Sequence, residues 1–238
     1  LEPLVAIVSA VLACAISVHL DAHINIRLIV LSAIIVFIPG LALALGLAEL
    51  AARHLVSGTA RVMDSFMLLF KLYFGAFIGI AIGFAIFGQA DFVQPEPLPK
   101  WTAWLAIFLL CSSLIVIFRT KFKHAAWSIA SGFIAYGTSI GSAMYLDYTL
   151  GTFVGAFSVG VFSNLFNRVA NAPASIVAMQ GLIVLVPGSK TYIGLNSLIE
   201  GQDFVYAEHI GQQTFLIFMS LVAGLIFANL ALPPKKSL

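Results

Sequence analysis

Ile38-Pro39-Gly40 and Val186-Pro187-Gly188 are the two short stretches that decide the fold of this chain, and each lies inside an apolar run. Proline has no amide hydrogen to donate, and its ring clashes with the preceding turn, so each stretch should interrupt a helix. The two prolines are 187 − 39 = 148 residues apart, and the sequence around them repeats without gaps. Interrupted apolar segments at corresponding places in two halves of a chain are typical of transporter binding sites.

The composition of the chain indicates a membrane protein. Of its 238 residues, 61% are hydrophobic and only 9% are charged. A soluble domain carries about 25% charged residues. The chain is therefore predicted to be all-α and polytopic, with the lipid bilayer as a partner. Its few basic residues are scattered or lie in short loops, which argues against nucleic acid as a partner. No metal-ligand spacing is present, and no cofactor is expected.

About eight stretches have roughly the 20 apolar residues that a helix needs to cross a bilayer core of about 30 Å. Short polar turns separate most of them, and a proline-rich loop runs from Gln89 to Lys100. The predicted spans are residues 3–20, 26–48, 63–88, 101–118, 126–146, 150–167, 174–198 and 208–232.

Basic residues indicate which side of the membrane each loop faces, because Lys and Arg stay in the cytoplasm. Both ends of the chain are then predicted to be cytoplasmic, in a cell inner (plasma) membrane. The basic residues assigned to this side are Arg53, Arg61, Arg119, Lys121, Lys123, Arg168, Lys235 and Lys236, whereas Arg27 and Lys100 fall on the other side.

The repeat relates the first three spans to the last three. The first set begins inside and the second begins outside, so the halves are predicted to be inverted relative to each other. Residues 1–94 would be the last three helices of a first module, and residues 95–238 a complete five-helix second module. A five-plus-five inverted-repeat transporter would complete this pattern with two further helices upstream. The chain begins with Leu1 rather than Met, which agrees with an additional amino-terminal part.

Three stretches resemble the threonine/serine exporter family. They are residues 35–43 (IVFIPGLAL), residues 54–61 (HLVSGTAR) and residues 185–189 (LVPGS). The resemblance implies ten helices in two modules, a soluble cytoplasmic segment before the first helix, and proton-driven export of small amino acids. A related branch, which splits the modules between two polypeptides, looks linked to dicarboxylate export. The fused modules of this chain favour the amino-acid branch.

The helix breaks themselves suggest a binding site. A helix that starts within the membrane presents unpaired amides and a partial positive charge, which together favour a carboxylate. The predicted substrate site therefore contains Pro39, Gly40, Pro187 and Gly188. Polar side chains that follow the second break would complete it, namely Ser189, Lys190, Thr191 and Asn196. The alternative is a pair of proline kinks that serve packing alone, with Lys190 extending to the interface.

Charged residues inside a membrane are costly and tend to be functional. Glu49, Asp64 and Lys71 are therefore candidates for proton coupling. Glu49 could instead form an ion pair with Arg53 four residues later. Asp64 and Lys71 lie two turns apart on one face, so each could serve the other.

Competing functions remain open at this point. The motifs of intramembrane proteases are absent from the sequence, so an enzyme is not expected. A dicarboxylate exporter is the main alternative, and a channel is a further one. Glycines at four-residue spacing, such as Gly75, Gly79 and Gly83, predict close helix pairs within one protomer or in a homo-oligomer.

Overall fold

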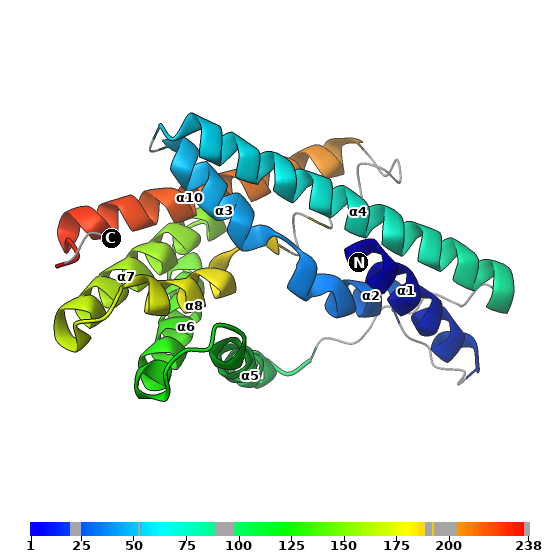
Figure 1. The fold of residues 1–238 in the computed structure, drawn as a ribbon, viewed down its shortest axis with the longest axis horizontal. Coiled ribbons are helices and arrows are strands. Elements are labelled where there is room, and N and C mark those ends of the chain that lie inside the picture. The colour runs from blue at the N-terminus through cyan, green and yellow to red at the C-terminus, as the bar shows by residue number, and fades with distance from the viewer. Residues whose placement is uncertain (20–24, 52, 89–97, 189–191, 193–203, 236–238) are drawn as a thin grey trace. The chain divides into compact units, whose positions relative to one another are not determined.

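The computed structural model describes residues 1–19, 25–51, 53–88, 98–188, 192 and 204–235. These residues form helices and no strands, which confirms the all-α prediction (Figure 1). The helices are α1 (Glu2–His19), α2 (Ile26–Ile34), the short 3-10 helix η1 (Ile35–Phe37), α3 (Gly40–Ala51), α4 (Leu55–Phe87), α5 (Trp101–Ile117), α6 (Phe122–Ala143), α7 (Tyr148–Ala170), α8 (Ser175–Leu185) and α10 (Phe204–Ala231).

Several of these helices are long and apolar enough to cross a membrane. Within the described residues there are four, namely α1, α4, α7 and the Gln212–Ala231 part of α10. A fifth span results if Ile26–Phe37 and Gly40–Leu47 are taken as one bent segment. Helices α5 and α8 are apolar but shorter. The chain is thus a polytopic helical membrane protein, and the count of eight spans stays a prediction.

The chain divides into two compact units. Unit 1 contains Leu1–Gly46, His54–Pro97 and Gly188–Gly211, and unit 2 contains Leu47–Arg53, Leu98–Pro187 and Gln212–Leu238. This division crosses the predicted module boundary at residue 94, because residues after the second break belong to unit 1.

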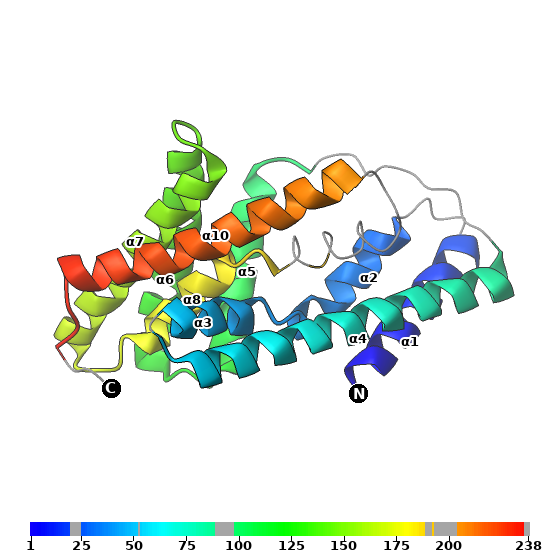
Figure 2. The same ribbon diagram turned by 90° about the horizontal axis from the view of Figure 1, so that it is seen from above.

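Helices α1 and α4 form the main contact of unit 1, and they run in the same direction (Figure 1; Figure 2 gives a second view). A row of glycines on α4 lies in this contact. A Cβ atom on Gly75 would lie 2.6 Å from the carbonyl oxygen of Pro3, and one on Gly79 would lie 2.6 Å from that of Ile7. A Cβ atom on Gly83 would lie 2.6 Å from the Cβ and Sγ atoms of Cys14. The glycine row thus joins two helices of the same protomer, because only glycine permits this approach of backbones in lipid.

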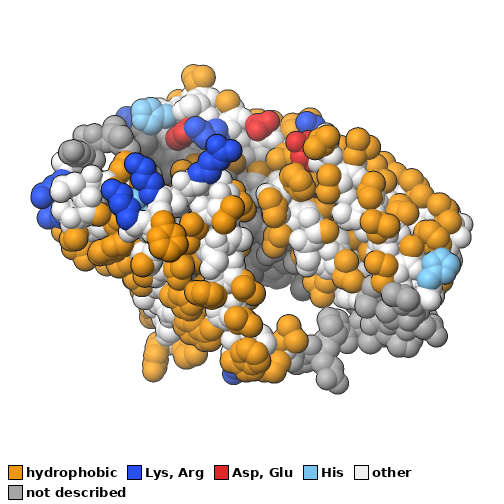
Figure 3. All heavy atoms as spheres, turned by 60° about the horizontal axis from the view of Figure 1, so that its bottom comes forward, with side chains coloured by type: hydrophobic (Ala, Val, Ile, Leu, Met, Phe, Trp, Pro, Cys, Tyr) orange, Lys and Arg blue, Asp and Glu red, His pale blue; other side chains and the backbone are white. Residues whose placement is uncertain are grey.

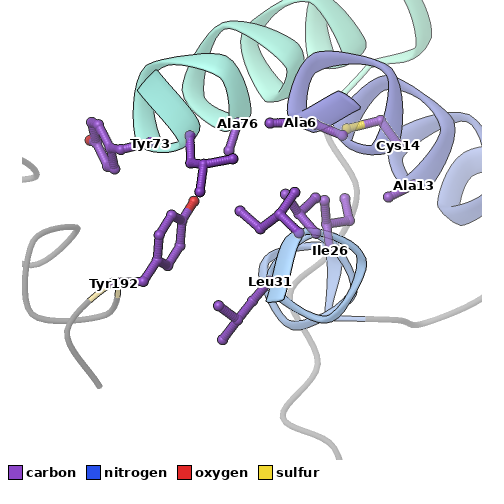
Figure 4. Close-up of a cluster of buried hydrophobic side chains, with 12 residues drawn as sticks. Ala6, Ala13, Cys14, Ile26, Leu31, Tyr73, Ala76 and Tyr192 are labelled. Atoms are coloured by element: carbon purple, nitrogen blue, oxygen red, sulfur yellow. The ribbon is translucent and has the colours of Figure 1, made fainter. Parts of the chain in front are cut away.

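A cluster of buried side chains fills the space between α1, α2 and α4 (Figure 4). Small residues of α1 line one side of it, and Leu72 and Tyr73 of α4 line another. Tyr192, which follows the second break, extends its ring toward the cluster from a different part of the sequence. Unit 1 therefore takes part of its core from the second half of the chain.

Unit 2 is built around α6, α7 and α8, with α5 against α6. Helices α7 and α10 also pack in parallel, since Gly224 meets Phe153 and Ala156 while Gly160 meets Ala228. Their carboxyl ends are joined by Asn164, whose Nδ2 donates to Asn229 Oδ1 and to the Leu232 carbonyl at 2.8 Å each.

The two parallel pairs have nearly the same register. Gly75 packs on Pro3 in unit 1, and Gly224 packs on Phe153 in unit 2. The corresponding offsets are 224 − 75 = 149 and 153 − 3 = 150 residues, close to the offset of 148 between the prolines. Each half of the chain therefore contains a similar parallel helix pair.

Large apolar side chains cover much of the surface (Figure 3). Many belong to α1, α4, α5 and α10, and several are more than half exposed, such as Leu4, Phe77 and Leu109. A surface of this kind is favourable only in contact with lipid. Lys and Arg side chains are instead gathered in a few places on the visible face.

Candidate functional site

The first helix break lies between η1 and α3. Ile38 has extended backbone angles, with φ −68° and ψ 119°, because the ring of the following proline disfavours the helical conformation. The α3 helix then restarts at once, since the Leu43 amide donates to the Pro39 carbonyl at 2.9 Å. The two halves of the bent segment meet at 53°. The predicted interruption at Pro39 is confirmed.

The second break has the same backbone geometry. Helix α8 ends at Leu185, and Val186 has φ −67° and ψ 129°, within about 10° of the angles of Ile38. The Val186 amide still donates to the Leu182 carbonyl at 2.9 Å, so the helix is regular up to the residue before proline. The predicted interruption at Pro187 is confirmed as well.

The glycines that follow the two prolines come together in unit 1. A Cβ atom on Gly188 would lie 3.2 Å from Cγ2 of Ile38 and 3.6 Å from the Cα atom of Gly40. Gly40 is buried. Two segments 148 residues apart in sequence thus meet at their breaks, and the absence of side chains on Gly40 and Gly188 permits this approach.

The polar residues predicted after the second break, Ser189, Lys190, Thr191 and Asn196, lie outside the described residues. Tyr192 is the described residue of this segment, and only 8% of it is exposed. After the first break, the corresponding positions are apolar, and Leu43 and Ala44 are buried.

The three residues proposed for proton coupling belong to two helices, α3 and α4. Glu49 is half-buried near the carboxyl end of α3, whereas Asp64 and Lys71 are exposed on α4. No ion pair joins Asp64 to Lys71 in the part of the chain that the structure describes. Lys71 precedes Gly75 by one helical turn, and Gly75 packs against Pro3 at the start of α1.

Sequence reasoning missed a group of buried polar side chains in unit 2. Gln180 of α8 is fully buried, and neither its Nε2 nor its Oε1 has a hydrogen-bond partner among the described residues. The same holds for the hydroxyls of Ser128 and Ser131 on α6. Leaving a buried amide unpaired costs about 1–3 kcal/mol, so these groups are suited to a water or a polar solute.

Ser128 and Ser131 lie on α6, which packs against the α8 helix that carries Gln180. The Ser131 hydroxyl lies against Gly181, where a Cβ atom would be only 2.6 Å away from Oγ. Ser128 precedes Ser131 by one helical turn on the same face of α6. The sequence signal was a single amide in the apolar run of residues 175–185, and an isolated polar residue at membrane depth is the feature to search for.

Comparison with known proteins identifies the family. The family model described as Threonine/Serine exporter, ThrE, matches residues 103–231, and a second threonine/serine exporter model matches residues 1–83. The chain belongs to the threonine/serine exporter family. Both halves of the chain match, which agrees with a membrane exporter that has both family segments on one polypeptide.

Relatives of this chain occur in fungi. It is 24% identical over 180 residues to an uncharacterized protein of Schizosaccharomyces pombe, covering 71% of this chain and 23% of the relative. It is 27% identical over 183 residues to pheromone-regulated membrane protein 10 of Candida albicans, covering 70% of this chain and 15% of the relative. The chain thus spans less than a quarter of the length of these relatives. No solved structure matches it.

Proposed function

We propose that this exporter is a secondary active transporter that moves small hydroxyl amino acids, threonine and serine, out of the cell across the inner (plasma) membrane, in exchange for protons. The observation that carries the proposal is the meeting of the two helix breaks, with Gly188 against Ile38 and Gly40. A single proline is enough to bend one helix for packing. Packing alone therefore does not require two breaks that also contact each other. Family membership supplies the substrate class.

The breaks supply what a zwitterionic solute needs. The first amides of a helix have no partner within it, and they carry partial positive charge. The Gly40 amide already donates to the Ile38 carbonyl at 2.8 Å, so the donors that helix α3 offers to a carboxylate are the next amides, those of Leu41 and Ala42. Because Gly40 and Gly188 have no side chains, a solute could approach the backbone closely at this point.

Side chains of the second half would recognise the rest of the substrate. We assign hydrogen bonds with the hydroxyl and carboxylate groups of the substrate to Ser189, Thr191 and Asn196. Lys190 would make an electrostatic contact with the carboxylate.

Glu49 is proposed to carry the coupled proton, because it is the half-buried carboxylate on the helix that begins at the first break. Asp64 and Lys71 are assigned a supporting role in the proton pathway. We propose that both ends of the chain lie in the cytoplasm. The transporter would then exchange protons for a small solute.

Transport into proteoliposomes tests the proposal. The full chain is reconstituted, an imposed pH gradient drives exchange, and the uptake of labelled threonine, serine and succinate is compared. We expect saturable threonine and serine flux that collapses when the gradient is dissipated. Succinate flux without threonine flux would establish the dicarboxylate alternative instead, and flux that does not saturate would establish a channel.

Variants test the site separately from the fold. Ser189→Ala and Asn196→Ala should each lower threonine transport about tenfold, the effect of about 1.4 kcal/mol from a lost hydrogen bond to a charged group. Ser113→Ala is the matched control, because this exposed serine donates only to the Leu110 carbonyl of its own helix. Wild-type transport in both site variants at normal membrane expression would remove their assignment.

A further inference from the structure

A cavity of about 540 Å³ lies in unit 2, where the loop between α5 and α6 meets the loop between α7 and α8. Its walls come from the ends of four helices. The lining residues are Phe118, Arg119, Thr120, Lys121, Lys123, His124, Asn171, Ala172, Pro173, Ser175, Ile176 and Met179. This volume lies within the range of about 300–1,000 Å³ that is usual for small-ligand sites. Neither helix break lies in this cavity.

The charge of the cavity wall is one-sided. Arg119, Lys121 and Lys123 line it, and no Asp or Glu is present in the lining. None of the three forms an ion pair within the residues that the structure describes. Arg168, a nearby basic residue in sequence, is used elsewhere, since its guanidinium donates to the Pro233 carbonyl at 2.7 Å. The cavity therefore presents three cations to whatever occupies it.

The backbone of both loops adds to this preference for anions. Helix α6 begins at Phe122 and helix α8 at Ser175, so both amino ends border the cavity. The partial positive charge at each helix start acts in the same direction as the three cationic side chains. The fourth basic residue, His124, is buried and stacks edge-on against Phe166 at 5.1 Å, which fixes one wall of the cavity.

Exposed apolar side chains lie beside the cations. Phe122, which stands between Lys121 and Lys123 in sequence, is 94% exposed. Val116 and Ile117 at the end of α5 are also exposed. A free anion needs no apolar neighbours, whereas a phospholipid presents an anionic headgroup next to acyl chains. Basic cavities between transmembrane helices are suited to such headgroups.

We propose that this cavity binds the anionic headgroup of a membrane phospholipid, with Arg119, Lys121 and Lys123 contacting the phosphate and Phe118 and Phe122 contacting the acyl chains. The site is distinct from the helix breaks and does not depend on the transported solute. It would anchor the ends of α5, α6 and α8 at the surface of an anionic leaflet.

Lipid binding to the purified full chain tests this proposal. The chain in neutral detergent is titrated with phosphatidylglycerol or with phosphatidylcholine, and retained lipids are counted by native mass spectrometry while the midpoint of thermal unfolding is followed. We expect phosphatidylglycerol to be retained and to raise the midpoint, and phosphatidylcholine to do neither. Lys121→Gln with Lys123→Gln should weaken phosphatidylglycerol binding about 25-fold, or about fivefold for each cation near an anionic surface.

Lys235→Gln is the matched control. Lys235 is exposed, it does not line the cavity, and its backbone amide rather than its side chain donates to Asn167 Oδ1 at 2.8 Å. Equal binding of phosphatidylglycerol by the double variant and by this control would overturn the proposal. Stabilisation by inorganic phosphate alone, without retained phosphatidylglycerol, would assign the cavity to a free anion and overturn the lipid assignment.

Discussion

At the scale of single residues, the contact between Gly188 and the first break is the feature most sensitive to substitution. The Cβ atom of an alanine at this position would meet the Cγ2 methyl group of Ile38 at 3.2 Å. A small shift of Ile38 accommodates one methyl group, whereas a branched or longer side chain must separate the two segments.

Gly188→Leu should therefore lower threonine transport by about tenfold or more, because overpacking costs about 1–3 kcal/mol. Gly188→Ala should retain most of the activity. Uptake by proteoliposomes at matched protein content is the measurement. Gly141→Leu is the control, since no atom lies within 4 Å of a Cβ at Gly141. Full activity of Gly188→Leu would show that the breaks need not touch.

His124 gives a second prediction at this scale. Burial, followed by the positive charges of Lys123 and Lys121, lowers the pKa of His124 from its ordinary value. The neutral ring is then favoured in the folded state, whereas an unfolded chain takes up the proton near pH 6.5. Stability is thus unaffected above that pH and is lost as the pH falls from there toward the folded pKa.

His124→Phe should remove this part of the pH dependence, because it keeps an aromatic ring against Phe166 and cannot be protonated. The midpoints of thermal unfolding of wild type and variant are compared between pH 5 and pH 8 in detergent. We expect the wild type to lose more stability than the variant below about pH 6.5. Parallel curves for both proteins would contradict the prediction.

At the scale of helices, local chemistry explains what the sequence could predict. Both breaks follow from the X-Pro pair, and the row of Gly75, Gly79 and Gly83 follows from four-residue spacing. Hydropathy placed the start of the third span at residue 63, but α4 begins at Leu55. The difference arises because hydropathy detects only the apolar part of a helix. The helix itself extends further toward the amino end, through polar residues such as Ser57, Thr59 and Arg61.

Other features required contacts that no local pattern contains. The basic cavity joins loops about 50 residues apart, at Lys121 and Asn171, so neither loop alone indicates it. The contact of Gly75 with Pro3 depends on the register of α4 against α1. The polar residues predicted after Gly188 lie outside the described residues, and their part in substrate binding stays a prediction.

The α1–α4 contact provides a stability test. Gly79→Val should lower the free energy of unfolding by about 1–3 kcal/mol, because its side chain would meet the backbone of Ile7 rather than a movable side chain. Thermal unfolding of the purified chain in detergent measures the effect. Gly141→Val, with open space around its Cβ, should have little effect. Equal midpoints for both variants would argue against the helix contact.

Pro187→Ala tests whether the second break serves transport. Alanine would let Val186 adopt helical angles and continue α8 beyond Leu185. We expect threonine exchange to fall while membrane expression is retained. Pro233→Ala is the control, because its carbonyl can still accept the bonds from Arg168. Wild-type exchange in Pro187→Ala would leave the break with a packing role only.

At the scale of the whole molecule, the predicted orientation of the second half in the membrane can be tested by labelling. Single cysteines at Lys121 and Asp147 lie at opposite ends of α6, and both native residues are exposed. A membrane-impermeant thiol reagent should label Lys121→Cys only from the cytoplasmic side and Asp147→Cys only from the outside. The native Cys14 and Cys111 are buried and give little background. Labelling of both from one side would contradict the predicted topology.

The matching backbone angles of Ile38 and Val186 have an evolutionary consequence. The bend is determined locally by two adjacent residues, the proline and the residue before it, and does not depend on contacts with the remainder of the chain. Two copies of such a segment, in the opposite orientations that the sequence predicts, would bring one bend against the other. Gene fusion would then have preserved an existing arrangement, after which only one copy needed to retain polar side chains.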